Sequence, residues 1–202
     1  MDKARYFIAV MMVVALPPSI GSWYLIHPFA QFWRRLGTVA TFSIVYALLI
    51  SACLLLWELR GMLLGADLGT QPILVMLAVP AAIVGIVIAR RRRRLLTSRI
   101  LMGVPEVSTT DKGRLLTEGI YAQTRNPRYL EFLAFAFAYV AFANYTGVWI
   151  LYALSCPAIH LVVLLEEREL RERFGAEYGD YCRRVPRYIP TRGDPASPAR
   201  RG

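Results

Sequence analysis

Residues 132–165 read FLAFAFAYVAFANYTGVWILYALSCPAIHLVVLL, a run of 34 residues without a charge. As one helix this stretch would be about 50 Å long, far more than the hydrocarbon core of about 30 Å requires for one crossing. The chain must therefore fold back, and Asn144-Tyr145-Thr146-Gly147 is the only turn-like patch within the run. The sequence predicts a helical hairpin whose two ends return to the same face of a membrane.

The composition agrees with a membrane protein. The chain has 202 residues, of which 56% are hydrophobic and 19% charged, and its mean hydropathy is +0.41. Such a chain is too apolar for an ordinary soluble domain. The net charge of +10 gathers at the ends of apolar runs, as in cytoplasmic loops, which disfavours a nucleic-acid partner. Neither a metal site nor a disulfide framework is expected from the spacing of Cys53, Cys156 and Cys182.

Three further uncharged stretches lie upstream, at residues 6–33, 36–57 and 68–89. Each is long enough for one crossing. The chain is therefore expected to be an all-α membrane protein with about five transmembrane helices, the last two forming the hairpin, and with a cytoplasmic C-terminal helical lid.

The first stretch contains Pro17-Pro18, which should kink or end its helix because proline cannot donate to the helical ladder. A cleaved signal peptide is the alternative, since Lys3 and Arg5 precede the apolar run. No small-x-small cleavage site stands in a convincing place after Leu16, which favours a retained span.

Five arginines, Arg90 to Arg94, follow the third stretch. They are costly in lipid and attracted to anionic head groups, so we interpret them as a topology anchor rather than a ligand site. If they are cytoplasmic, Arg34 and Arg35 lie on the same side, and the N-terminus and residues 58–67 lie on the other. We expect a multi-pass protein of a bacterial cytoplasmic membrane whose active site faces the cytoplasm.

The chain divides into three parts by composition. Residues 1–94 are predicted to form a three-span scaffold, and residues 95–190 a core that contains the hairpin. Within this core, residues 95–118 are expected to be a cytoplasmic connection of mixed composition that follows the membrane surface. Residues 191–202, rich in Pro, Gly, Arg and Ser, are expected to be a disordered basic tail.

The start of the hairpin carries a helix-start signal. Asn126 is a candidate N-cap, and Pro127 suits the first helical position. The N–H groups of that first turn, with Arg125 beside them, would suit a carboxylate or a phosphate. The alternative is structural: Asn126 only caps the helix, and Arg125 extends to lipid head groups.

The exit of the hairpin carries the opposite charge. Glu166 and Glu167 stand at the edge of the bilayer, where carboxylates need water or cationic partners. A ligand ammonium or ribose hydroxyls would suit them, and a solvated, salt-bridged helix is the alternative. His160, seven residues before Glu167, lies on the same helical face and is either a pocket residue or a helix-packing group.

Together the two ends of the hairpin predict a site for a zwitterion with a flat apolar part. S-adenosylmethionine is such a ligand. Because Arg125 to Tyr129 and Glu166-Glu167 lie at the two ends of a folded-back pair of helices, the hairpin should bring them side by side although about 40 residues separate them.

Over about its last 80 residues the chain resembles the superfamily of isoprenylcysteine carboxyl methyltransferases and phospholipid methyltransferases. The ordered set of motifs is specific, whereas any one of them is weak. The motifs are Gly119-Ile120-Tyr121, Arg125-Asn126-Pro127-Arg128-Tyr129, Glu166-Glu167-x-x-Leu170, Phe174-Gly175-x-x-Tyr178-x-x-Tyr181 and Val185-Pro186-Arg187-Tyr188-Ile189-Pro190. The family pattern commonly has His where this chain has Asn126, which argues against a proton-shuttling role at that position.

The resemblance implies a membrane methyltransferase that binds S-adenosylmethionine between the fourth and fifth spans. Carried over to this chain, it assigns cofactor binding to Tyr121, Arg125, Asn126, Pro127, Tyr129, Glu166 and Glu167. The helical spacing to Glu167 adds His160 as a further candidate for cofactor binding. It also implies a C-terminal lid over residues 171–190 with helix breaks near Gly175 and Pro186. Arg187 is the candidate for orienting an anionic substrate. The catalytic residues stay unassigned.

The acceptor is expected to be lipophilic or a small amphiphile that enters from the bilayer, with a carboxylate favoured over an amine or a thiol. An NADPH-dependent reductase of the sterol type is the alternative enzyme, because those proteins have a similar Arg-x-Pro-x-Tyr start and an acidic residue near the position of Glu131. A non-enzymatic membrane sensor or assembly factor is the third hypothesis.

Overall fold

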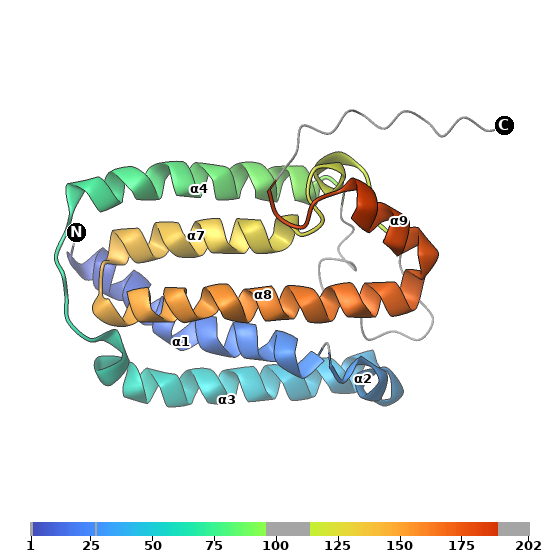
Figure 1. Ribbon diagram of the computed structural model, residues 1–202. Helices are drawn as coiled ribbons and strands as arrows, with labels where there is room; N and C mark the ends of the chain where they lie inside the picture. The colour runs from blue at the N-terminus through green and yellow to red at the C-terminus, as the bar shows by residue number, and fades with distance from the viewer. Residues whose placement is uncertain (1, 27, 96–113, 190–202) are drawn as a thin grey trace.

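The computed structural model describes residues 2–26, 28–95 and 114–189. Five long helices in these ranges run side by side (Figure 1): α1 (Asp2–Ile26), α3 (Thr38–Leu64), α4 (Pro72–Arg93), α7 (Pro127–Ala143) and α8 (Thr146–Phe174). The short helices α2 (Ala30–Leu36), η1 (Gly119–Ala122) and α9 (Ala176–Arg184) gather at one end of the bundle. α7 packs mainly on α4 and also contacts α1 and α8, while α3 packs on α1.

Four of these helices, α1, α3, α4 and α8, are long and apolar enough to cross a membrane. α7 has 17 residues and is about 26 Å long, at the lower limit for a span. Large apolar side chains on the outer faces of α3 and α4 are exposed, among them Val39, Met62, Ile73 and Met76. The prediction of an all-α membrane protein is confirmed; of the about five predicted transmembrane helices, four are clear candidate spans and α7 is shorter.

The first predicted span differs in detail from the structure. Residues 6–33 do not form one helix, because α1 ends at Ile26 and α2 begins at Ala30. Pro17 and Pro18 do not end α1, which continues through both of them. Val13 and Val14, about one helical turn before the prolines, are buried against the other helices, and this packing supports a helix that its local sequence disfavours.

The turn of the hairpin lies where the sequence places it. α7 ends at Ala143, and Asn144 takes a left-handed conformation with φ 53° and ψ 53° that asparagine tolerates better than most residues. Its backbone N–H donates to the Val140 carbonyl at 2.8 Å, and its side-chain amide donates to the Gly69 carbonyl at 2.9 Å. Asn144 therefore ends one helix and ties the turn to the connection between α3 and α4.

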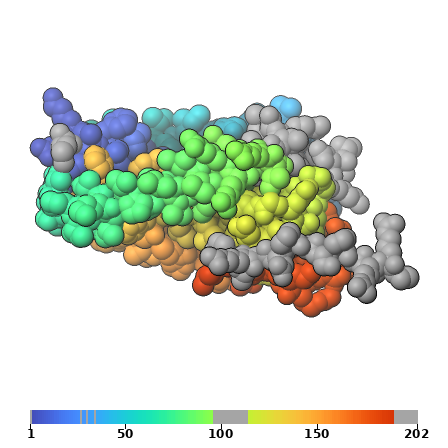
Figure 2. Space-filling model, turned by 90° about the horizontal axis from the view of Figure 1, so that it is seen from above, coloured from blue at the N-terminus to red at the C-terminus, as the bar shows by residue number. Residues whose placement is uncertain are grey.

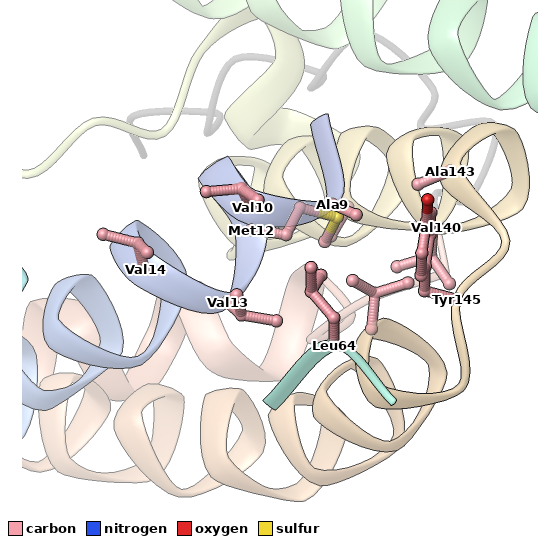
Figure 3. Close-up of a cluster of buried hydrophobic side chains, with 11 residues drawn as sticks. Ala9, Val10, Met12, Val13, Val14, Leu64, Val140, Ala143 and Tyr145 are labelled. Atoms are coloured by element: carbon pink, nitrogen blue, oxygen red, sulfur yellow. The ribbon is translucent and has the colours of Figure 1, made fainter. Parts of the chain in front are cut away.

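Glycine is required at the first turn of α8. A Cβ at Gly147 would lie 1.8 Å from the carbonyl oxygen of Leu63, so the start of α8 passes directly against the end of α3. The apolar core next to this contact includes Leu64, Val140, Tyr145 and Val148, and Figure 3 shows several of these side chains converging with those of α1. The hairpin turn and the end of α3 form one packed unit.

A buried arginine fastens the same end of the bundle. The Arg5 side chain is only 2% exposed; its Nε donates to the Ala143 carbonyl at 3.1 Å and its Nη2 pairs with Asp67. Hydrogen bonds from the Gly69 N–H and from Arg5 lower the pKa of Asp67. The start of α1 is thus tied to both neighbouring loops.

The other end of the bundle carries the basic segments. Arg35 on α2 and Arg90 to Arg93 on α4 lie at the end where α9 is found (Figure 1), so the two arginine-bearing segments share one end as predicted. Seen from above (Figure 2), the yellow chain after residue 114 lies between the end of α4 and the red C-terminal segment. Most of the predicted connection at 95–118 and all of the predicted basic tail at 191–202 lie outside the described residues.

We expect Gly147→Ala to lower the free energy of unfolding by about 2 kcal/mol, because the added methyl group would collide with backbone atoms that cannot move without separating α3 from α8. Chemical denaturation in detergent micelles measures this. Gly61→Ala on α3 is the matched control, since a Cβ there meets nothing within 4 Å. Equal stability of the two variants would contradict the close contact.

Candidate functional site

Three segments that are distant in sequence meet at the basic end of the bundle. They are the start of α7, the end of α8 and the chain that follows α9. At their junction Glu167, which is 1% exposed, is surrounded by Arg125, Asn126, Arg171 and Arg187; these five residues are called the Glu167 cluster below. The prediction that the two ends of the hairpin lie side by side is confirmed.

Arg125 uses its whole guanidinium group inside the protein. Its Nε and Nη2 donate to Glu167 Oε1 at 3.3 and 3.1 Å, and its Nη1 donates to the carbonyls of Cys182 and Val185 at 2.9 and 3.0 Å. An arginine has five N–H donors, and here they all point to protein acceptors. Arg125 therefore joins the hairpin to the C-terminal segment.

Asn126 is the N-cap of α7 and Pro127 its first residue, as predicted. The side chain of Asn126 makes no capping hydrogen bond, which corrects its predicted capping role. Its amide instead donates to Glu167 Oε1 at 3.1 Å and to the Arg187 carbonyl at 3.3 Å. The Asn126 amide thus adds a hydrogen bond to the buried carboxylate instead of capping the helix.

The C-terminal segment folds back onto the start of α7. α8 ends at Phe174, Gly175 adopts φ 56°, and α9 ends at Arg184. The backbone N–H of Arg125 then donates to the Pro186 carbonyl at 2.9 Å, and Thr124 Oγ1 donates to the Arg187 carbonyl at 3.1 Å. Both predicted helix breaks are therefore present.

His160 lies farther along α8, where its side chain is exposed. Its Nδ1 is 2.7 Å from the Tyr188 hydroxyl, so the returning segment follows α8 for about two turns from Glu167. His160 is thus placed beside the C-terminal segment and not inside the Glu167 cluster. Its predicted part in cofactor binding stays a prediction.

A second group of side chains surrounds Glu166. The Tyr129 hydroxyl donates a short hydrogen bond to Glu166, and Tyr129 is 1% exposed. Tyr121 lies close enough to feel the charges of Glu166 and Arg92, and burial raises its pKa to about 12. Tyr121 is therefore protonated at neutral pH. Among the described residues no arginine or lysine forms an ion pair with Glu166.

One arginine of the basic run is turned into the protein. Arg92 forms a two-point contact with Glu131, with Nε to Oε2 at 2.8 Å and Nη2 to Oε1 at 3.2 Å, and both side chains are nearly buried. A topology anchor needs no such partner, so Arg92 also joins α4 to α7. Glu131, the acidic residue whose position resembles that of sterol-type reductases, is engaged in this ion pair.

Sequence reasoning missed several residues that shape this end. Thr124, 1% exposed, holds the C-terminal segment, and the Arg128 guanidinium stacks over the Trp23 ring at 5.1 Å. Trp23 also packs edge-on against Tyr129 with ring centroids 5.4 Å apart. The stacking of Arg128 on a ring that is distant in sequence leaves no local sequence pattern, so no local signal could have identified Trp23.

Comparison with known proteins gives one informative match. Over 171 residues the chain is 31% identical to methanethiol S-methyltransferase 2 of Bradyrhizobium diazoefficiens. The match covers 80% of this chain and 64% of that protein, so the chain spans less than two thirds of its length. No family model matches, and no solved structure matches. The similarity supports a membrane methyltransferase.

We expect Glu167→Gln to lower the free energy of unfolding by about 3 kcal/mol, because it leaves the shielded Arg125 without its counter-charge. Denaturation in detergent micelles measures the loss. Glu172→Gln is the control on the same helix: Glu172 is exposed and pairs with the exposed Arg168 at 3.2 Å, so the change should stay within about 0.5 kcal/mol. A stable Glu167→Gln variant would refute the structural role of the cluster.

Proposed function

We propose that the protein is an integral membrane methyltransferase that uses S-adenosylmethionine. The observation that carries the proposal is that a negative group and an excess of positive groups lie next to each other at the ends of the hairpin. Within the described part of the chain, the Glu166 carboxylate has the Tyr129 hydroxyl and no cation as its partner, and one residue later Glu167 meets three guanidinium groups. A ligand that carries both an ammonium and a carboxylate group fits such neighbouring charges.

The residues of this end have different roles in the proposal. Glu166, with Tyr129 orienting it, receives the amine or the ribose hydroxyls of the cofactor. Asn126, Arg125 and Glu167 hold the surrounding segments in place, and Tyr121 closes the site from η1. Because its pKa is about 12, Tyr121 acts as a neutral hydrogen-bond donor and not as a base.

S-adenosylmethionine supplies a methyl group that is already activated on a sulfonium centre. The protein must then mainly position the acceptor and exclude water. The returning segment from Val185 to Tyr188, held by Arg125 and Thr124, covers the start of α7 and is suited to this exclusion. A thiolate or carboxylate acceptor needs no general base.

The similarity to a methanethiol methyltransferase supports a choice among the acceptor classes. The sequence favours a carboxylate, but the relative is a methanethiol methyltransferase, so we place a small thiol first. We propose that the acceptor enters from the bilayer between the apolar helices. The arginine-rich end would face the cytoplasm, because cytoplasmic loops carry the excess of arginine and lysine.

Calorimetry with S-adenosylhomocysteine tests the cofactor. We expect saturable binding by the detergent-purified protein and about tenfold weaker binding by Glu166→Gln, because a charge-assisted hydrogen bond is lost. Glu172→Gln should bind like the parent protein. NADPH, tested in parallel, should not bind; binding of NADPH without S-adenosylhomocysteine would replace the proposal with a reductase.

A tritiated-methyl transfer assay tests the acceptor. Membranes that contain the protein should label methanethiol or another short-chain thiol faster than a fatty-acid carboxylate or an aliphatic amine. Glu166→Gln membranes provide the background rate. If only the carboxylate is labelled, the proposal of a thiol acceptor is wrong, and a carboxylate, which the sequence favours, takes its place.

A further inference from the structure

The charges of the Glu167 cluster do not balance. Arg187 grips Glu167 at two points, with Nε to Oε1 at 3.1 Å and Nη2 to Oε2 at 2.9 Å. Arg171 Nη2 approaches Oε2 at 3.8 Å, and Arg125 holds Oε1. One carboxylate therefore faces three guanidinium groups, and the cluster as a whole carries two excess positive charges.

The three arginines differ in their access to solvent. The side chain of Arg125 is 9% exposed, that of Arg187 is 32% exposed and that of Arg171 is 56% exposed. Arg125 also directs all of its donors to protein acceptors. The excess charge is therefore available at Arg171 and Arg187, whose guanidinium groups converge on the same oxygen of Glu167.

The place of Arg171 on α8 favours a ligand at the membrane surface. Arg171 is one helical turn after Glu167, farther from the apolar run than any other member of the cluster on this helix. Glu166, on the membrane side, has a hydroxyl partner and no cation among the described residues. A negative site and a positive site are thus about one turn of helix apart.

We propose that Arg171 and Arg187 form a binding site for the carboxylate or phosphate group of a ligand. Where that ligand is the methyl donor, the assignment rests on the proposed function and deepens it: its carboxylate binds Arg171 and Arg187, and Arg125, which the sequence nominated, positions Glu167 from within. An anionic lipid phosphate is the other source of the same chemistry.

Calorimetry distinguishes the carboxylate from the rest of the ligand. We expect Arg171→Gln to weaken binding of S-adenosylhomocysteine about tenfold. The variant should leave binding of 5′-methylthioadenosine unchanged, since that nucleoside lacks the amino-acid group. Arg168→Gln is the matched control, because Arg168 is an exposed arginine of the same helix that pairs with Glu172 away from the cluster.

Arg187→Lys keeps the charge and loses the two-point grip, so it should weaken S-adenosylhomocysteine binding in the same selective way. Arg171 lies at an exposed position with one long contact, so its variant should fold. Equal losses for both ligands, or no loss for either variant, would overturn the assignment to the methyl donor.

Nanodiscs test the lipid source. If the anion is a lipid phosphate, phosphatidylglycerol should raise the melting temperature of the parent protein relative to phosphatidylcholine, and Arg171→Gln should abolish this rise while Arg168→Gln keeps it. If Arg171→Gln keeps the thermal rise and also binds S-adenosylhomocysteine as tightly as the parent protein does, the proposal of an anion site is wrong. If the parent protein binds no S-adenosylhomocysteine, the proposed function fails, whereas the lipid result still decides the anion site.

Discussion

The burial of one carboxylate organises the functional end of this protein. Glu167 sits where a membrane helix leaves the apolar layer, and a charge in that place is tolerated only with close partners. Arg125 and Asn126 come from the start of α7, while Arg187 comes from the chain beyond α9. Removing any one of these partners leaves the remaining buried charges incompletely paired, which is costly. The cluster therefore holds three segments together and determines where ligand-binding groups can lie.

The two ends of the bundle differ in charge and in packing. At the far end a single arginine, Arg5, fastens the start of α1 to Asp67 and to the last carbonyl of α7, and Gly147 lets α3 and α8 approach. That end is balanced in charge and tightly packed. At the basic end Glu166 accepts a hydrogen bond from the Tyr129 hydroxyl, and the Glu167 cluster beside it contains more guanidinium groups than carboxylates. Such an arrangement is poor for stability and suitable for binding.

The sequence was most informative where length and local chemistry decide the structure. The hairpin follows from 34 uncharged residues, the turn at Asn144 from its residue type, and the helix breaks from Gly175 and Pro186. It was least informative where long side chains choose partners across many residues. Arg92 with Glu131, Arg5 with Asp67 and the amide of Asn126 with Glu167 have no local signature, because each contact depends on packing formed elsewhere.

The order in which the ribosome delivers the chain also matters. The carbonyls that receive Arg125 belong to Cys182 and Val185, which translation supplies only after α8, ending at Phe174, has been made. Until then the long helices are present, but the two carbonyls that accept hydrogen bonds from Arg125 Nη1 are still missing. A nascent chain stopped before residue 182 would lack these two acceptors, so the chain beyond α8 is needed to complete the surroundings of Arg125.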